Sequence, residues 1–236
     1  MTRCTDLISL GGNTMNRKLL TALAFAAVPL FAAGFASNAM ATVELRLTSG
    51  ASTTGVIVGA GCGTETCVTF NGSVGAWNIN LTTGFSAGPG EPTMDLSSVD
   101  ATSSASADPL EIELSDNGFS VGSSLFSLAS SGHIVSGSGT AIYSAYFDAG
   151  NTDFAKTTLI GTLGPFSGLY ATSTTGTGTM GTPYSLTEDL VLTAGSSGVR
   201  WSTDSSITYV PEPASLTLLG SALVGLGWLG RRRKVA

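Results

Sequence analysis

Two cysteines are the residues whose spacing most directly suggests chemistry. Cys62 and Cys67 frame the segment Cys-Gly-Thr-Glu-Thr-Cys, which lacks the Cys-x-x-Cys spacing of a catalytic redox pair. A metal site would need further ligands, and the only histidine, His133, is distant in the sequence. Nearby cysteines pair in an oxidising compartment. We therefore predict a disulfide between Cys62 and Cys67, constraining a turn before residues 68–70, and no metal site.

His133 raises the question of a Ser-His-Asp triad. It follows Ser130-Ser131-Gly132, a segment typical of a loop that enters a strand. The chain has so many serines that one of them near His133 carries no information. A Gly-x-Ser-x-Gly elbow between a strand and a helix is absent from the sequence. We expect a surface or loop histidine and no catalytic residue.

Paired carboxylates could hydrolyse a glycosidic bond. Glu111 and Glu113 fall on one face of an alternating segment, but a solvated strand face has the same spacing. Asp148-Ala149-Gly150-Asn151-Thr152-Asp153 could offer oxygens to Ca²⁺, yet it lacks the spacing of an EF-hand and fits a turn with Asx hydrogen bonds. We expect neither a cofactor nor a metal at these carboxylates.

The segments that would hold these residues alternate between apolar and polar side chains, the period of a half-buried strand. Alternation of this kind occupies residues 43–47, 76–81, 110–114, 142–147 and 189–193, and a last strand is expected at 206–210. Turn-forming clusters are Asn71-Gly72, Asp116-Asn117-Gly118, Ala149-Gly150-Asn151 and Ser196-Ser197-Gly198.

A segment with a helical period is missing between the predicted strands, which argues against a βαβ architecture. The Thr-Gly tract at residues 171–182 is expected to be a loop or a weak edge strand. Many short strands separated by turn signals predict an all-β fold, an antiparallel β-sandwich that is jelly-roll-like or Ig-like.

The N-terminal region has the order of a secretory signal peptide. It shows a positive pair, an apolar run and a small-x-small cleavage pattern, which are Arg17-Lys18, residues 19–35 and Ala39-Met40-Ala41. We predict that residues 1–41 are a leader with a signal helix, cleaved after Ala41. Met15 is a more natural start than Met1, and an uncleaved anchor helix is the alternative.

The C-terminal region combines a stiff polar motif, an uncharged apolar run and a cationic end. These are Pro211-Glu212-Pro213, residues 214–230 and Arg231-Arg232-Arg233-Lys234. The prolines favour an extended backbone. A helix over 214–230 would be about 25 Å long, near the lower limit for crossing a bilayer core of about 30 Å. We predict a short transmembrane helix there; the alternative is a buried C-terminal helix.

This tail, residues 210–236, resembles the PEP-CTERM sorting signal of Gram-negative bacteria. The resemblance rests on the three parts in order and on nothing upstream: Pro211, Glu212, Pro213, the apolar span, Arg231, Arg232, Arg233 and Lys234. It implies that the motif is recognised by exosortase, a membrane-embedded, cysteine-dependent processing enzyme. Proteins with this tail are associated with exopolysaccharide, biofilm and the cell surface.

Residues 42–209 form the remaining body, which suits one domain with a real core. Its three cations, Arg46, Lys156 and Arg200, stand against fourteen anions, a net charge of −11 compared with −6 for the whole chain. Nucleic acid is excluded as a partner because phosphate contacts need a basic footprint. Cations flank both apolar ends and stay inside, so the body lies outside the cytoplasmic membrane.

These patterns predict a non-enzymatic protein that the secretion machinery exports and the inner membrane holds transiently. Its tail is processed by exosortase, and the body remains in the cell envelope, at the surface or in the extracellular matrix. The expected role is structural, adhesive or associated with exopolysaccharide. Two alternatives stay open: an exported carbohydrate-active hydrolase and a permanently anchored envelope protein.

Overall fold

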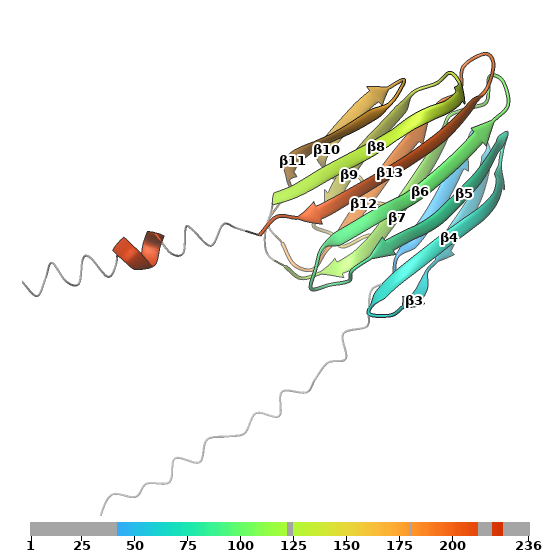
Figure 1. Ribbon diagram of the computed structural model, residues 1–236. Helices are drawn as coiled ribbons and strands as arrows, with labels where there is room; N and C mark the ends of the chain where they lie inside the picture. Colours follow the sequence, from blue (N-terminus) through green and yellow to red (C-terminus); the bar gives the residue numbers. More distant parts are fainter. Residues whose placement is uncertain (1–41, 122–124, 180, 212–218, 224–236) are drawn as a thin grey trace, which may run out of the picture. The chain divides into compact units, whose positions relative to one another are not determined.

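The computed structural model describes residues 42–121, 125–179, 181–211 and 219–223. The strands in this part of the chain form two antiparallel sheets that pack face to face (Figure 1). In chain order they are β1 Glu44–Ser49, β2 Ser52–Val58, β3 Ala60–Cys62, β4 Glu65–Val74, β5 Trp77–Ser86, β6 Thr93–Ser103, β7 Leu110–Phe119, β8 Leu125–Gly137, β9 Ala141–Asp148, β10 Thr158–Phe166, β11 Tyr170–Thr177, β12 Tyr184–Leu192 and β13 Val199–Tyr209. The prediction of an all-β, two-sheet fold is confirmed.

One sheet has six strands in the order β10-β9-β12-β7-β1-β2, and the other has seven in the order β11-β8-β13-β6-β5-β4-β3. The last strand, β13, lies between β8 and β6 inside the seven-stranded sheet (Figure 1). It is also longer than the strand predicted at 206–210. The seven-stranded sheet is therefore complete only when the final residues of the body are in place.

The core lies between the sheets and follows from the alternation along each strand. Trp77 on β5 and Trp201 on β13 are both fully buried. Each indole has a polar partner, since Trp77 Nε1 donates to the carbonyl of Asp108 at 2.7 Å and Trp201 Nε1 donates to the carbonyl of Thr193 at 3.4 Å. Both large aromatic side chains are thus buried with their N–H groups hydrogen-bonded.

Among the described residues, the core lies within the body. Its buried apolar residues lie between Val43 and Ile207, and both sheets are formed within residues 44–209. We therefore expect residues 42–211 to fold on their own. The predicted signal helix, with Ala39 and Ala41, lies outside the described residues.

Most of the predicted transmembrane helix at 214–230 also lies outside the described residues. The part that is described, residues 219–223, is helical. Within the described part of the chain, no helix is both long and apolar enough to cross a bilayer.

Two predicted turns are wrong. Asn71 and Gly72 lie inside β4, paired with Asn80 and Ile79 of β5. A Cβ at Gly72 would come within 3.1 Å of the Phe70 ring, so glycine at this position makes room for an aromatic side chain. The cluster 116–118 lies inside β7, where the register against β12 shifts, and Gly118 with φ of 78° sits at that irregularity.

Residues 171–177 of the Thr-Gly tract belong to an edge strand, one of the two structures expected for the tract. β11 pairs with β8 over Tyr170–Thr177 and has no strand on its other side in the sheet.

The chain passes from one sheet to the other at Gly59, between β2 and β3. Its N–H donates to the carbonyl of Val43 at 2.8 Å, and a Cβ at this position would lie 2.6 Å from the carbonyl oxygen of Cys67. Only glycine lets the backbone approach this closely.

Candidate functional site: the outer face of the seven-stranded sheet

A row of polar side chains crosses the outer face of the seven-stranded sheet at right angles to the strands. Successive cross-strand partners from β4 to β8 are Asn71, Asn80, Asp100, Ser202 and His133. Neighbours of these residues along each strand face the core, so period-2 alternation points the whole row outward.

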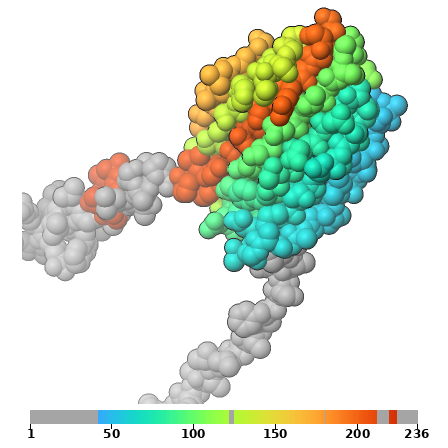
Figure 2. Space-filling model, turned by 45° about the vertical axis from the view of Figure 1, so that its right-hand side comes forward, coloured from blue at the N-terminus to red at the C-terminus, as the bar shows by residue number. Residues whose placement is uncertain are grey.

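A second row runs parallel to the first, two residues further along β4, β5, β6 and β13 and three along β8, where the register shifts. Its members, again from β4 to β8, are Ser73, Asn78, Thr102, Arg200 and Ser136. Adjacent strands are about 4.8 Å apart, and two residues along a strand span roughly 7 Å. The two rows therefore form a polar ladder across five strands, which lie side by side as coloured bands in Figure 2.

A shallow groove of about 710 Å³ runs between the rows over β4, β5, β6 and β13. Gly72 and Ile79 belong to its floor, and the polar residues of the two rows form its walls. Ser73 donates a 2.6 Å hydrogen bond to Asn78 Oδ1, and Thr82 donates one of 3.3 Å to Asn80 Oδ1. Because each bond uses the amide oxygen, both asparagines keep their NH₂ groups for a ligand.

Arg200 is the one cation of the body on this face, and it forms no ion pair with any described residue. The other two cations of the body, Arg46 and Lys156, form ion pairs with Glu111, Glu113 and Asp189. The exposed guanidinium of Arg200 adds N–H donors to the groove wall.

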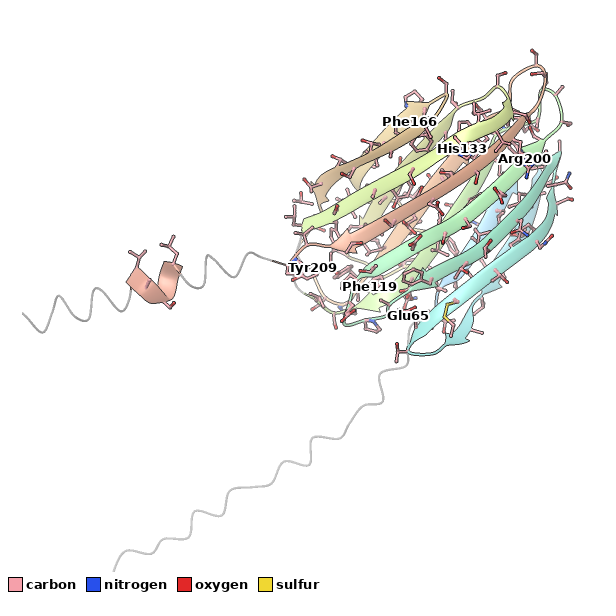
Figure 3. All side chains as sticks on the ribbon, viewed as in Figure 1. Glu65, Phe119, His133, Phe166, Arg200 and Tyr209 are labelled. Carbon is pink, nitrogen blue, oxygen red and sulfur yellow. A yellow bond between two sulfur atoms is a disulfide. The ribbon has the colours of Figure 1, made fainter. Side chains whose placement is uncertain are left out.

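His133 lies on this face, on the strand next to Arg200 (Figure 3). Its direct cross-strand neighbour is Ser202, which in turn lies opposite Asp100. A catalytic triad needs the histidine between the nucleophile and the acid, whereas the serine occupies the middle position in this row. The arrangement gives donors and acceptors to a ligand and does not match a triad.

A smaller groove of about 230 Å³ lies further along the same face, between β6, β8, β11 and β13. Its carboxylates, Asp95 and Asp204, are diagonal neighbours across β6 and β13. Burial, and then the charge of Asp204, raise the pKa of Asp95 to about 6. Asp204 Oδ1 accepts a 2.5 Å hydrogen bond from the backbone N–H of Ser98. The pair was missed because its members are far apart in the sequence.

The predicted carboxylate pair lies on the other sheet. Lys156 Nζ reaches Glu111 Oε1 at 2.7 Å, Glu113 Oε1 at 3.0 Å and Asp189 Oδ2 at 2.7 Å. Arg46 Nε is 2.7 Å from Glu113 Oε2, and its guanidinium lies 4.4 Å from the centroid of the Phe154 ring. The expectation of a solvated face is therefore wrong for Glu113, whose side chain is 4% exposed. Both glutamates serve an ion-pair network.

The loop that begins at Asp148 is a turn with Asx hydrogen bonds, as expected. Asp148 Oδ2 accepts from the N–H of Thr152 at 3.0 Å, and Asp148 Oδ1 accepts from the Thr157 hydroxyl at 2.8 Å. The side chain of Asp153 binds Asn117 and Ser115 of β7. The carboxylates of this loop are thus occupied by donors of the protein itself.

Cys62 and Cys67 are disulfide-bonded at the β3–β4 hairpin, with their Cα atoms 5.9 Å apart. The bond links the edge strand of the seven-stranded sheet to its neighbour. It lies on β3 and β4, and neither cysteine lines the groove.

The body ends within two residues of the Pro-Glu-Pro motif. The N–H of Tyr209 donates to the carbonyl of Pro92 at 3.0 Å, and the N–H of Val210 donates to the carbonyl of Leu125 at 2.9 Å. Pro211 lines a small pocket with Tyr209 and Pro92 (Tyr209 is labelled in Figure 3). The remaining predicted sorting residues, Glu212, Pro213, Arg231, Arg232, Arg233 and Lys234, lie outside the described residues.

Comparison with family models matches residues 210–234 to the PEP-CTERM protein-sorting motif. The chain is a PEP-CTERM sorting domain-containing protein. The motif implies export, transient anchoring in the membrane and recognition by exosortase. The match covers the tail of this PEP-CTERM protein and leaves its body unassigned.

No curated protein matches the chain. Among solved structures, it resembles the enzymatically active domain of tailspike protein 4 of bacteriophage CBA120 with a TM-score of 0.29 and 10% identity, over 59% of this chain and 18% of the tailspike. It also resembles TmCBM27, a carbohydrate-binding module with specific mannan recognition, with a TM-score of 0.28 and 8% identity, over 62% of this chain and 90% of that module. The chain spans less than a fifth of the tailspike, and similarity this low supports no functional assignment.

Proposed function

We propose that this protein is a non-enzymatic component of the cell surface or extracellular matrix that holds polysaccharide. Exosortase processes its tail near Pro211-Glu212-Pro213, and the body remains outside the cell. The sorting motif at residues 210–234 supports the delivery half of the proposal. The polymer-holding half rests on the ladder of polar side chains.

The observation that carries the binding half is the pair of polar rows with a groove between them. Amides, hydroxyls and a guanidinium stand at regular positions on five neighbouring strands, and exposed large apolar side chains are not among the groove residues. Sugar hydroxyls are both donors and acceptors, so a surface that mixes amides with hydroxyls complements them. The rigid sheet also pre-organises these groups, which lowers the entropic cost of binding.

The test is affinity electrophoresis of residues 42–211 in gels that contain individual neutral or acidic polysaccharides. A variant that combines Asn78→Ala, Asn80→Ala and Arg200→Ala removes donors from both rows. The control combines Thr53→Ala and Thr162→Ala, which alter strands of the six-stranded sheet. We expect at least one polymer to retard the wild type and the control, with affinity at least about tenfold lower for the triple variant. Equal mobility of all three proteins in every gel would contradict the proposal.

A second candidate function is hydrolysis of the same polymer, favoured by Asp95 and Asp204 in the smaller groove. A carboxyl with a raised pKa beside a carboxylate that accepts a backbone hydrogen bond has the division of roles of a general acid and its partner. The test measures new reducing ends in polysaccharide incubated with residues 42–211. Release by the wild type and its loss in Asp95→Asn, with binding retained, would support hydrolysis. Intact polymer with the wild type would exclude it.

A further inference from the structure

We infer that the polymer is an extended, neutral, β-linked hexose chain that lies across the strands, with one sugar per strand from β4 to β8. This inference rests on the proposed function and specifies its ligand. Three properties of the polar ladder carry it: the repeat between strands, the separation of the two rows, and the charge of the body.

The repeat between strands fixes the direction of the chain. Neighbouring members of a row are separated by the strand spacing of about 4.8 Å, which is close to the advance per sugar in an extended β-1,4-linked chain. A chain in this direction meets an equivalent polar position at each sugar. Five strands give a site of about 19 Å between β4 and β8. A chain parallel to the strands would meet the two rows only once.

The separation of the rows fits the width of the same chain. The two rows are separated by roughly 7 Å along the strands. Between the rows the strand positions Gly72 and Ile79 face the core, so the floor is backbone and a sugar ring can lie on it between the two rows. Hydroxyls on one edge of the sugar ribbon would then face Asn78, Thr102 and Arg200. Those on the other edge would face Asn80 and Asp100.

The charge of the body selects a neutral polymer. The body carries a net charge of −11, and Asp100 stands in the groove wall opposite Arg200, so a polyanion would be repelled. Twist of about 20° per strand turns the rows gradually, and rotation about glycosidic bonds lets a flexible single chain follow them. A helical α-linked glucan cannot present the same edges to all five strands.

The test is titration calorimetry of residues 42–211 with cello-oligosaccharides from the disaccharide to the hexasaccharide. We expect affinity to rise with each added sugar up to about the pentasaccharide and then to level off, since the rows cross five strands. Maltohexaose is expected to bind at least about tenfold more weakly than cellohexaose, and added salt should change the affinity for cellohexaose little.

Two variants locate the ends of the site. Ser136→Trp places a bulky side chain at the β8 end, so the plateau should come at a shorter oligosaccharide, whereas Thr162→Trp on β10 should leave it unchanged. Equal affinity for cellobiose and cellohexaose, a preference for maltohexaose, or no binding of any cello-oligosaccharide would each overturn the inference. In those cases the proposed function would still stand if another polysaccharide retarded the wild type in affinity electrophoresis and failed to retard the Asn78→Ala/Asn80→Ala/Arg200→Ala variant.

Discussion

The phenol of Tyr143 donates a 2.6 Å hydrogen bond to Oε1 of Glu188 in the centre of the sandwich, and neither side chain is more than 1% exposed. Burial, with a smaller effect of the charge of Asp95, raises the pKa of Glu188 well above its ordinary value. The glutamate occupies a core position that β12 otherwise fills with leucines, Leu186 and Leu190. Burial thus favours the neutral form of this hydrogen-bonding group between the sheets.

This pair predicts a specific pattern of stability. Tyr143→Phe should lower the free energy of unfolding by about 1–3 kcal/mol because a buried acceptor loses its donor. Glu188→Gln keeps an uncharged acceptor and should stabilise the protein at neutral pH. Denaturant unfolding measures both, and Tyr146→Phe on the outer face of β9 should stay within about 0.5 kcal/mol of the wild type. An unchanged midpoint for Tyr143→Phe would contradict this role.

The raised pKa of Asp116 predicts that the free energy of unfolding falls as pH rises. Burial raises its pKa from 3.8 to about 6, against hydrogen bonds that favour the charged form. The folded state thus holds the proton more tightly than the unfolded chain. The resulting stabilisation is complete below pH 3.8 and is lost as pH rises through about 6.

Asp116→Asn should remove this dependence because its amide does not ionise. We expect it to be more stable than the wild type by about 3 kcal/mol near pH 7.5 and similar to it near pH 3.5. Thermal unfolding across this range, followed by circular dichroism, measures the difference. A constant offset between the two proteins at all pH values would argue against a titrating Asp116.

Lys156 holds three carboxylates on the outer face of the six-stranded sheet. Lys156→Met should cost about 2–4 kcal/mol because Glu113 and Asp189, both nearly buried, lose their shared cation. Arg200→Met is the matched control. It removes a cation without an ion pair to a described residue and should change stability by less than about 0.5 kcal/mol. Equal effects of the two substitutions in urea unfolding would refute the importance of the network.

The Cys62–Cys67 disulfide closes a short loop, with a sequence separation of five residues. Removal by a double Cys→Ser change should therefore cost only about 2 kcal/mol, as expected from chain entropy for so small a loop. Polysaccharide binding should persist because the groove lies away from β3. Loss of binding together with a cooperative, near-normal unfolding transition would mean that the bond supports the site.

Processing of the tail can be read from the mass of the released protein. Intact-mass measurement should show a body that begins near Thr42 and lacks Arg231-Arg232-Arg233-Lys234. In cells without exosortase the same protein should keep its tail and stay with the membrane fraction. Recovery of the complete tail on all released protein would contradict processing.

The two-sheet fold was predictable because alternation is a local signal. Buried apolar residues two positions apart, such as Leu45 with Leu47 on β1 or Leu110 with Ile112 on β7, indicate a strand by their spacing alone. Asn71-Gly72 misled for a local reason as well. The pair has turn chemistry, but the Phe70 ring needs the space beside Gly72, and that contact is not visible in the sequence.

The candidate site could not be predicted because it depends on register. Alternation places Asn78 and Asn80 outward on β5, yet it does not say that Asn80 lies opposite Asp100 or that Arg200 closes the same groove. Those relations are set by pairing between strands far apart in the sequence. Glu188 was missed for a related reason, since its hydrogen-bond partner Tyr143 comes from β9, far away in the sequence.

Co-sedimentation with exopolysaccharide purified from the producing cells tests the central claim most directly. Residues 42–211 of the wild type, and the Thr53→Ala/Thr162→Ala control, should enter the pellet with the polymer. The Asn78→Ala/Asn80→Ala/Arg200→Ala variant should remain in the supernatant while keeping the wild-type unfolding midpoint. The same distribution for all three proteins would contradict a polysaccharide-binding role for the seven-stranded sheet.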